Sequence, residues 1–112
     1  MLRGEVWYAI WPNDPQKKSS PVLIVSNNLR NAAPNLLDLL VVKLTGLYRD
    51  DRSKKPVNNS EDLVIKFKKE TIIQCDQIYS IEKAILKSRI SQVSIQTMND
   101  VDERLKNALD LH

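Results

Sequence analysis

Residues 71–83 read TIIQCDQIYSIEK, in which a run of strand-forming residues leads straight into polar side chains. The β-branched residues at 71–73 predict a strand that runs toward the interior. The strand then presents two amides, a thiol and a carboxylate in succession: Gln74, Cys75, Asp76 and Gln77. Such groups at a strand end indicate a catalytic group, a binding surface or a polar turn.

Four further stretches have the apolar patterns of strands: residues 4–10, 21–26, 36–44 and 62–68. The first and last alternate between apolar and polar residues, as half-exposed strands do. The second is a nearly continuous apolar run, which is typical of a strand buried on both faces. Residues 11–20 and 50–61 are polar, contain prolines and are expected to be loops.

Helical patterns come late in the chain. Residues 80–89 predict a short helix or a turn. From Ser94, a candidate N-cap, apolar residues recur at three- and four-residue steps as Ile95, Met98, Val101, Leu105, Ala108 and Leu109. Several short strands followed by one amphipathic helix predict a mainly-β fold, a small barrel or curled sheet with a helix packed on it. We expect one domain, residues 1–112, because a chain of this length can bury only one core.

The composition excludes several classes of protein. With one cysteine and one histidine, the chain can form neither an intrachain disulfide nor a His/Cys metal site, so no metal and no cofactor is expected. It contains neither an apolar run long enough to span a bilayer nor a signal-peptide-like start, which predicts a cytoplasmic location without membrane association. The net charge of +3 includes a cluster of cations between Lys43 and Lys69. This cluster indicates either a partner that carries phosphates or a solvated face.

Four landmarks, in order along the chain, resemble the MazF/PemK/Kid toxins of type II toxin–antitoxin modules. Residues 3–7 (RGEVW) resemble the R-G-[DE]-[IV]-[WY] strand of that family, and residues 21–27 (PVLIVSN) resemble its second strand. Leu44-Thr45 matches the end of the third strand. Residues 75–81 (CDQIYSI) resemble C-D-Q-[IVP]-[RK]-[TS]-I, the most distinctive stretch of the family.

This resemblance implies a small SH3-like barrel with a C-terminal α-helix, the fold of PemK, MazF and CcdB, working as a homodimer. It also implies a metal-independent endoribonuclease that cuts single-stranded RNA by attack of the substrate's own 2′-hydroxyl, and an acidic antitoxin that blocks the RNA groove. Such a reaction needs a base, an acid and a donor that stabilises the charged phosphorane.

The resemblance also implies roles for individual residues. Asp76 aligns with the proposed general base of the PemK/Kid branch, although a carboxylate at a strand end can equally bracket a turn. Thr45 aligns with the threonine implicated in cleavage. Gln77 aligns with a residue whose side-chain amide contacts RNA. The alternative is that the Gln77 amide forms hydrogen bonds with the protein backbone at the strand end. We expect Trp7 and Trp11 to be core or dimer-contact residues, and Cys75 to be a small buried hydrophobe.

Three positions depart from the family pattern, each by loss of a cation. The arginine before the second strand is Ser20, the arginine two residues before the aspartate is Gln74, and the cation after D-Q-I is Tyr79. We hypothesise that Lys18, or Lys17, partly substitutes for the first arginine; the alternative is that both are solvated loop lysines. Tyr79 is expected either to stack on a base or to pack on the helix predicted to follow it. The predicted RNA-contacting residues are therefore Gln77, Lys17, Lys18, Ser20, Gln74 and Tyr79.

The missing cations leave a second function open. Removing one charge-stabilising donor from an active site lowers the rate on the order of a hundredfold or more. The alternative to a ribonuclease toxin is therefore a catalytically weakened protein of the same fold that acts by binding RNA or a partner protein.

Overall fold

Six strands form one antiparallel sheet in the computed structural model, which describes residues 1–111. The predicted domain end, His112, lies outside the described residues. The strands are β1 (Glu5–Ile10), β2 (Ser19–Ile24), β3 (Asp38–Gly46), β4 (Asp62–Lys66), β5 (Glu70–Glu82) and β6 (Leu86–Gln92). The helices are α1 (Asn28–Ala32), the single 3₁₀ turn η1 (Lys83–Ile85) and α2 (Ile95–Leu109). The expected mainly-β fold with a C-terminal helix is confirmed.

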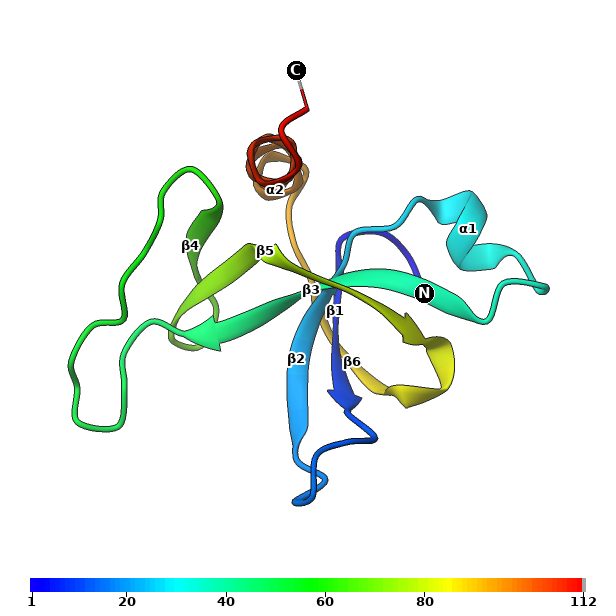
Figure 1. Ribbon diagram of the computed structural model, residues 1–112, viewed down its shortest axis with the longest axis horizontal. Coiled ribbons are helices and arrows are strands. Elements are labelled where there is room, and N and C mark those ends of the chain that lie inside the picture. The colour runs from blue at the N-terminus through cyan, green and yellow to red at the C-terminus, as the bar shows by residue number, and fades with distance from the viewer. Residues whose placement is uncertain (112) are drawn as a thin grey trace.

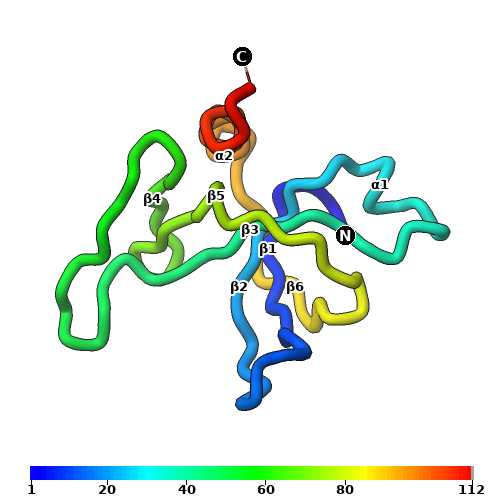
Figure 2. Tube along the Cα trace, viewed as in Figure 1, coloured from blue at the N-terminus to red at the C-terminus, as the bar shows by residue number. Residues whose placement is uncertain are grey.

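The sheet is strongly curled. Its strand order is β4-β5-β3-β2-β1-β6, so the longest strand, β5, pairs with both β4 and β3. In the view of Figure 1, β1, β2, β3, β5 and β6 overlap near the centre and β4 lies to one side, with α2 at the top, α1 on the side opposite β4 and the β1–β2 connection at the bottom. The connection between β3 and β4 projects well away from the sheet (Figure 2). Within residues 1–111, no helix combines the length and apolar character that a membrane span requires.

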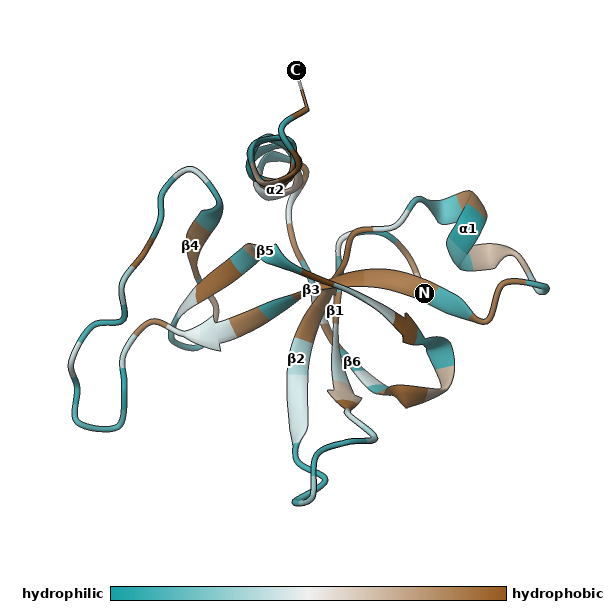
Figure 3. Ribbon diagram, in the orientation of Figure 1, coloured by the Kyte–Doolittle hydropathy of each residue, from teal (hydrophilic) through white to brown (hydrophobic). Residues whose placement is uncertain are grey.

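Two apolar clusters lie on opposite faces of the sheet, because successive strand residues point to opposite sides. One cluster includes Val6, Leu23, Val42 and Ile73, and α2 packs on it through Val101. The other contains Ala9, Val22, Ile24, Leu39, Val41, Ile81 and Leu86. Figure 3 shows hydrophobic residues where the strands cross and mostly hydrophilic ones in the peripheral loops. Because β2 and β3 contribute to both clusters, each contains a run of consecutive apolar residues, 21–24 in β2 and 39–42 in β3.

The helix predicted from Ser94 is confirmed, including its start. The Ser94 side chain accepts a hydrogen bond from the Thr97 amide, which satisfies one of the free amides of the first turn. Val101 is fully buried, whereas Ile95 at the start of the predicted apolar face is 83% exposed. Arg3 ties the other end of the chain to this helix by an ion pair with Asp102.

The helix or turn predicted for residues 80–89 is wrong except for η1. β5 continues to Glu82, and β6 follows η1 as an edge strand paired with β1. Most residues of β6 are exposed, so this strand carries little of the apolar alternation by which strands are recognised. The short helix α1 was not expected; the Asn27 side chain caps it by accepting the Arg30 amide at 2.8 Å.

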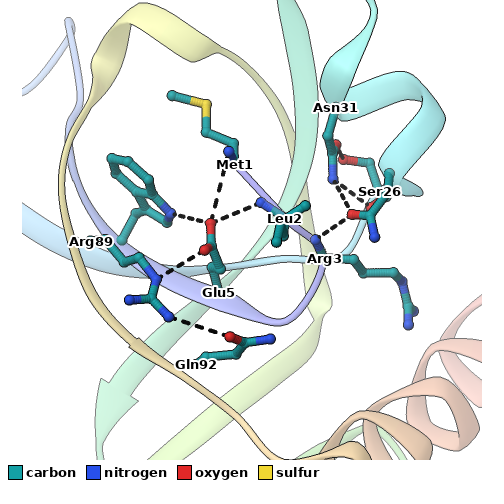
Figure 4. Close-up of polar contacts among 10 residues, drawn as sticks. Met1, Leu2, Arg3, Glu5, Ser26, Asn31, Arg89 and Gln92 are labelled. Atoms are coloured by element: carbon teal, nitrogen blue, oxygen red, sulfur yellow. Dashed lines mark hydrogen bonds and ion pairs between the residues drawn. The ribbon is translucent and has the colours of Figure 1, made fainter.

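A buried carboxylate joins the start of the chain to β1 and β6. The side chain of Glu5 is 9% exposed, and its Oε1 accepts hydrogen bonds from the Leu2 amide at 2.8 Å and the Trp7 indole at 3.1 Å. Its Oε2 lies 2.9 Å from Nε of Arg89, which also donates to Gln92 (Figure 4). In the same view Asn31 and Ser26 hold α1 against the chain before it.

These contacts set the ionisation of Glu5. Burial alone raises the pKa of the carboxyl, but the hydrogen bonds and the positive charges of the N-terminus and Arg89 outweigh it, so the net pKa lies below its ordinary value of 4.5. A group whose pKa is lowered on folding stabilises the folded state above its unfolded pKa, and that contribution disappears as the pH falls through the folded value.

We therefore predict that Glu5→Gln lowers the free energy of unfolding by about 2 kcal/mol at pH 7, since hydrogen bonds to a charged group are lost. The difference from the wild type should shrink as the pH falls below 4.5. Urea unfolding at pH 7 and pH 3.5 measures both effects. Glu82→Gln, at an exposed position, is the matched control. If the difference in unfolding free energy between the variant and the wild type did not change with pH, the stabilisation could not be attributed to the ionised Glu5 carboxylate.

Candidate nucleic-acid interface

The stretch Cys75–Gln77 forms a bulge in β5. Lys43 of β3 pairs with Gln74, and the preceding residue of β3, Val42, pairs with Ile78. The three residues between Gln74 and Ile78 therefore have no partner on β3. The Cys75 amide instead donates to the Glu61 carbonyl at 3.1 Å. Extra residues of this kind bend a strand and re-aim its side chains, which turns β5 around the predicted site.

The three bulge residues have different environments. Asp76 is exposed and Gln77 is half-buried. Cys75 is fully buried in the core cluster beneath α2, as expected of a small hydrophobe. Its burial, reinforced by the nearby charge of Asp62, raises the pKa of the thiol to about 12, so Cys75 stays protonated and is no nucleophile.

An open hollow of about 440 Å³ lies beside the bulge, on the face of the sheet that α2 does not cover. Its lining comes from the β1–β2 loop and from β2, β3 and β5: Trp11, Asn13, Asp14, Ser20, Lys43 and Tyr79. Two residues predicted to contact RNA, Ser20 and Tyr79, therefore share one concave surface.

Two aromatic rings and one lysine form the wall of this hollow. The rings of Trp11 and Tyr79 meet edge to face, with centroids 5.2 Å apart and planes at 66°. The Lys43 Nζ lies 5.4 Å from the Trp11 centroid and 5.0 Å from that of Tyr79. The Tyr79 hydroxyl donates to Oε1 of Gln77 at 3.1 Å. Gln77 is thus positioned by the same cluster.

Thr45 lies further along the same strand. It points to the same side of β3 as Lys43, because residues two apart share a face, about 7 Å away. Its Oγ1 accepts a hydrogen bond of 2.7 Å from the Nζ of Lys55, which belongs to the long β3–β4 connection. A cation donating to the oxygen leaves the Thr45 hydrogen free for an acceptor outside the protein.

The structure brings together most, but not all, of the predicted residues. Ser20, Gln74 and Tyr79 surround Lys43, and Gln77 joins them through Tyr79. Lys17 and Lys18 are exposed in the β1–β2 loop and do not line the hollow. Lys17 adopts a left-handed conformation, with φ of 53°, in a turn closed by its amide and the Asp14 carbonyl.

Three residues of the site were not among the predicted site residues: Trp11, Lys43 and Lys55. Of these, Lys43 and Lys55 belong to the cation cluster that indicated either a partner that carries phosphates or a solvated face. Trp11 was expected in the core or a dimer contact; it is half-buried, packs against the second core cluster and also lines the hollow. For Lys43 a signal existed, because it is the one charged residue in the otherwise apolar stretch 39–44. Nothing local marks Lys55, whose contact with Thr45 depends on the course of a loop.

Two further features bear on what the surface can bind. In the part of the chain that the structure describes, no three His, Cys, Asp or Glu side chains gather into a metal-binding group. A second, mainly apolar hollow of about 530 Å³ lies on the opposite side of β2, between Tyr8 and Ile90 on one side and Phe67 on the other. Lys68 and Lys69 also line it.

Comparison with known proteins identifies the relatives of this chain. The family described as PemK-like, MazF-like toxin of type II toxin–antitoxin system matches residues 2–109. The endoribonuclease MazF of Staphylococcus saprophyticus is 28% identical over 117 aligned positions, covering 100% of this chain and 93% of that protein.

Solved structures agree with this result. A mycobacterial endoribonuclease in complex with its cognate antitoxin has a TM-score of 0.77 at 26% identity, covering 100% of this chain and 97% of its own. The Mycobacterium tuberculosis toxin MazF-mt6 has a TM-score of 0.73 at 19% identity, covering 96% and 98%. This second likeness extends to the fold alone.

The cluster at the hollow predicts an order of stabilities for two variants of Tyr79. Tyr79→Leu removes the edge-to-face contact and one cation–π contact and should lower the free energy of unfolding by about 1–2 kcal/mol. Tyr79→Phe keeps the ring and loses only the bond to Gln77, which should cost about 0.5–1 kcal/mol. Urea denaturation followed by tryptophan fluorescence measures both. A larger loss for Phe than for Leu would contradict the described packing.

Proposed function

Because the chain belongs to the PemK-like, MazF-like toxins of type II toxin–antitoxin systems, we propose that it is a metal-independent endoribonuclease that cuts single-stranded RNA. The observation that carries this proposal is the placement of Thr45 and the Cys75–Gln77 bulge on either side of one strand pair, Lys43–Gln74. The relatives named as endoribonucleases support it. Cleavage of messenger RNA in the cytoplasm is the biological setting that we propose.

The proposed reaction uses the RNA as its own nucleophile. The 2′-hydroxyl loses its proton as its oxygen bonds to phosphorus. The bond from phosphorus to the 5′-oxygen breaks, and the leaving 5′-oxygen takes up a proton from water. The products are a 2′,3′-cyclic phosphate and a 5′-hydroxyl. No metal or other cofactor is needed, because the attacking group is part of the substrate.

Two side chains have proposed catalytic roles. Asp76 accepts the proton of the 2′-hydroxyl, and its exposed position at the bulge leaves it open to a substrate. Thr45 donates its hydroxyl hydrogen to a phosphoryl oxygen, whose negative charge grows in the transition state. Lys55 supports this step by holding the Thr45 oxygen from the other side.

The remaining predicted residues are proposed to bind RNA around these two. Gln77 and Gln74 offer amides to base edges, and Ser20 offers a hydroxyl inside the hollow. Tyr79 presents part of a ring face on which a base can stack. Lys17 and Lys18, exposed in the β1–β2 loop, contact phosphates that flank the cleaved bond.

We predict that the purified protein cuts a long single-stranded RNA in the presence of EDTA and leaves 5′-hydroxyl ends. Asp76→Asn and Thr45→Val should each lower the cleavage rate by about 100-fold or more, because a base and a charge-stabilising donor are removed. Sequencing of RNA ends and single-turnover rates provide the measurement.

Glu103→Gln on α2 is the matched control, since its carboxylate is exposed and its ion pair among residues 1–111 is with Lys106. RNA that is retained on the protein but stays intact at every concentration would favour the alternative function, a protein of this fold that acts by binding. Cleavage that needs a divalent metal would contradict the proposed chemistry.

The proposed partners are a second copy of the chain and an acidic antitoxin. The mycobacterial relative solved with its cognate antitoxin supports the second partner. The apolar hollow near Phe67, with Lys68 and Lys69 in its lining, fits an acidic segment that carries apolar side chains.

We predict that the chain elutes with twice its 12.9 kDa mass in size-exclusion chromatography with light scattering. Lys68→Glu/Lys69→Glu should weaken binding of the acidic partner by about tenfold or more, because two attractive charges become repulsive. Lys106→Glu, on α2, changes a charge elsewhere on the surface and serves as the control. A monomer at micromolar concentration would rule out the dimer.

A further inference from the structure

The three positions at which this chain lacks a family cation converge on a single lysine. Ser20 and Tyr79 line the same hollow as Lys43, and Gln74 is its direct partner across the β3–β5 ladder. We propose that Lys43 is the phosphate-binding cation of the site and supplies from the middle of β3 the charge that these three positions lack. This inference rests on the proposed function, whose substrate it binds.

The surroundings of Lys43 leave its charge available. Its neighbours along β3, Val42 and Leu44, are buried in the core cluster beneath α2. The Lys43 side chain therefore extends from the opposite face of the sheet, which α2 does not cover. The ion pairs of the described residues join cations to Glu5, Asp102 and Glu103, and none includes Lys43. Asp14 is the acidic residue in the lining of the hollow, and its Oδ1 accepts the Gln16 amide at 2.9 Å.

The two aromatic rings hold the ammonium without saturating it. A cation near ring faces is attracted by the ring quadrupoles, yet its three N–H donors keep their capacity for stronger acceptors. A free lysine loses considerable rotamer freedom when it binds a phosphate. Because Trp11 and Tyr79 already confine Lys43, with centroids 5.4 and 5.0 Å from Nζ, less of that freedom remains to be lost.

The other lysines near the site are less suited to this role. Lys55 is engaged with the Thr45 hydroxyl at 2.7 Å. Lys17 and Lys18 are exposed and lie outside the lining of the hollow. We therefore assign to Lys43, rather than to the loop lysines, the role of the missing arginine.

The test separates substrate binding from cleavage. Lys43→Met keeps the length of the side chain and removes the charge, and Lys87→Met on the exposed edge strand β6 is the matched control. With cleavable RNA, Lys43→Met should lower the single-turnover rate by about 100-fold. Lys17→Ala/Lys18→Ala should mainly raise the RNA concentration needed for half-maximal rate.

A second measurement uses an oligonucleotide that cannot be cut because every 2′-hydroxyl is methylated. Its affinity is measured over a series of salt concentrations. Loss of one phosphate contact should reduce the slope of log affinity against log salt by about 0.7 in Lys43→Met. In the same background Ser20→Arg should restore part of the slope and of the rate, because residue 20 lines the same hollow. A purely structural Lys43 would show no such rescue.

The outcomes distinguish this inference from the proposed function. A folded Lys43→Met that cuts RNA at the wild-type rate overturns the role of Lys43 and leaves the ribonuclease intact. A wild type that binds RNA without cutting it overturns the ribonuclease, and the salt slope still decides the role of Lys43. A wild type that neither cuts nor binds overturns both. If Lys43→Met does not fold, Lys43→Gln, which keeps a polar end in the hollow, undergoes the same measurements.

Discussion

The site depends on one irregularity in strand pairing. Because β3 offers no partners for Cys75–Gln77, β5 bends between its pairings at Lys43 and Val42. The bend buries Cys75 beneath α2 and leaves Asp76 exposed at the surface. It also carries Tyr79 back onto the face that holds Lys43 and Trp11. Without these extra residues, every later side chain of β5 would point to the opposite face of the sheet.

Around this bend the positive charges lie at positions other than those that the resemblance implies. Positions 20, 74 and 79 are neutral, while Lys43 extends from β3 and Lys55 reaches Thr45 from the long β3–β4 connection. The attraction between a phosphate and a cation depends on the distance between the two charges and not on which strand carries the cation. A chain of this fold that lacks the arginine of the sequence motif can therefore still place a positive charge at the same site.

Much of the fold could be predicted from the sequence, because its signals are local. The cap at Ser94, the helical period after it and the apolar runs of β2 and β3 are visible in short windows. The strand β6 was missed because it is an exposed edge whose pairing with β1 is formed by residues far apart in the chain. The same limit applies to the site. Asp76 and Thr45 could be singled out by resemblance, whereas the meeting of Lys43 with Trp11 and Tyr79 depends on strand register and on a loop.

The buried thiol gives this molecule an internal reporter. The sequence contains one cysteine, and it lies fully buried at the bulge with its pKa raised to about 12. Alkylating reagents act on the thiolate, so Cys75 is protected for as long as α2 and the bulge stay packed. Its labelling rate consequently measures how often this part of the protein opens, and a ligand that holds β5 in place slows that rate without any engineered probe.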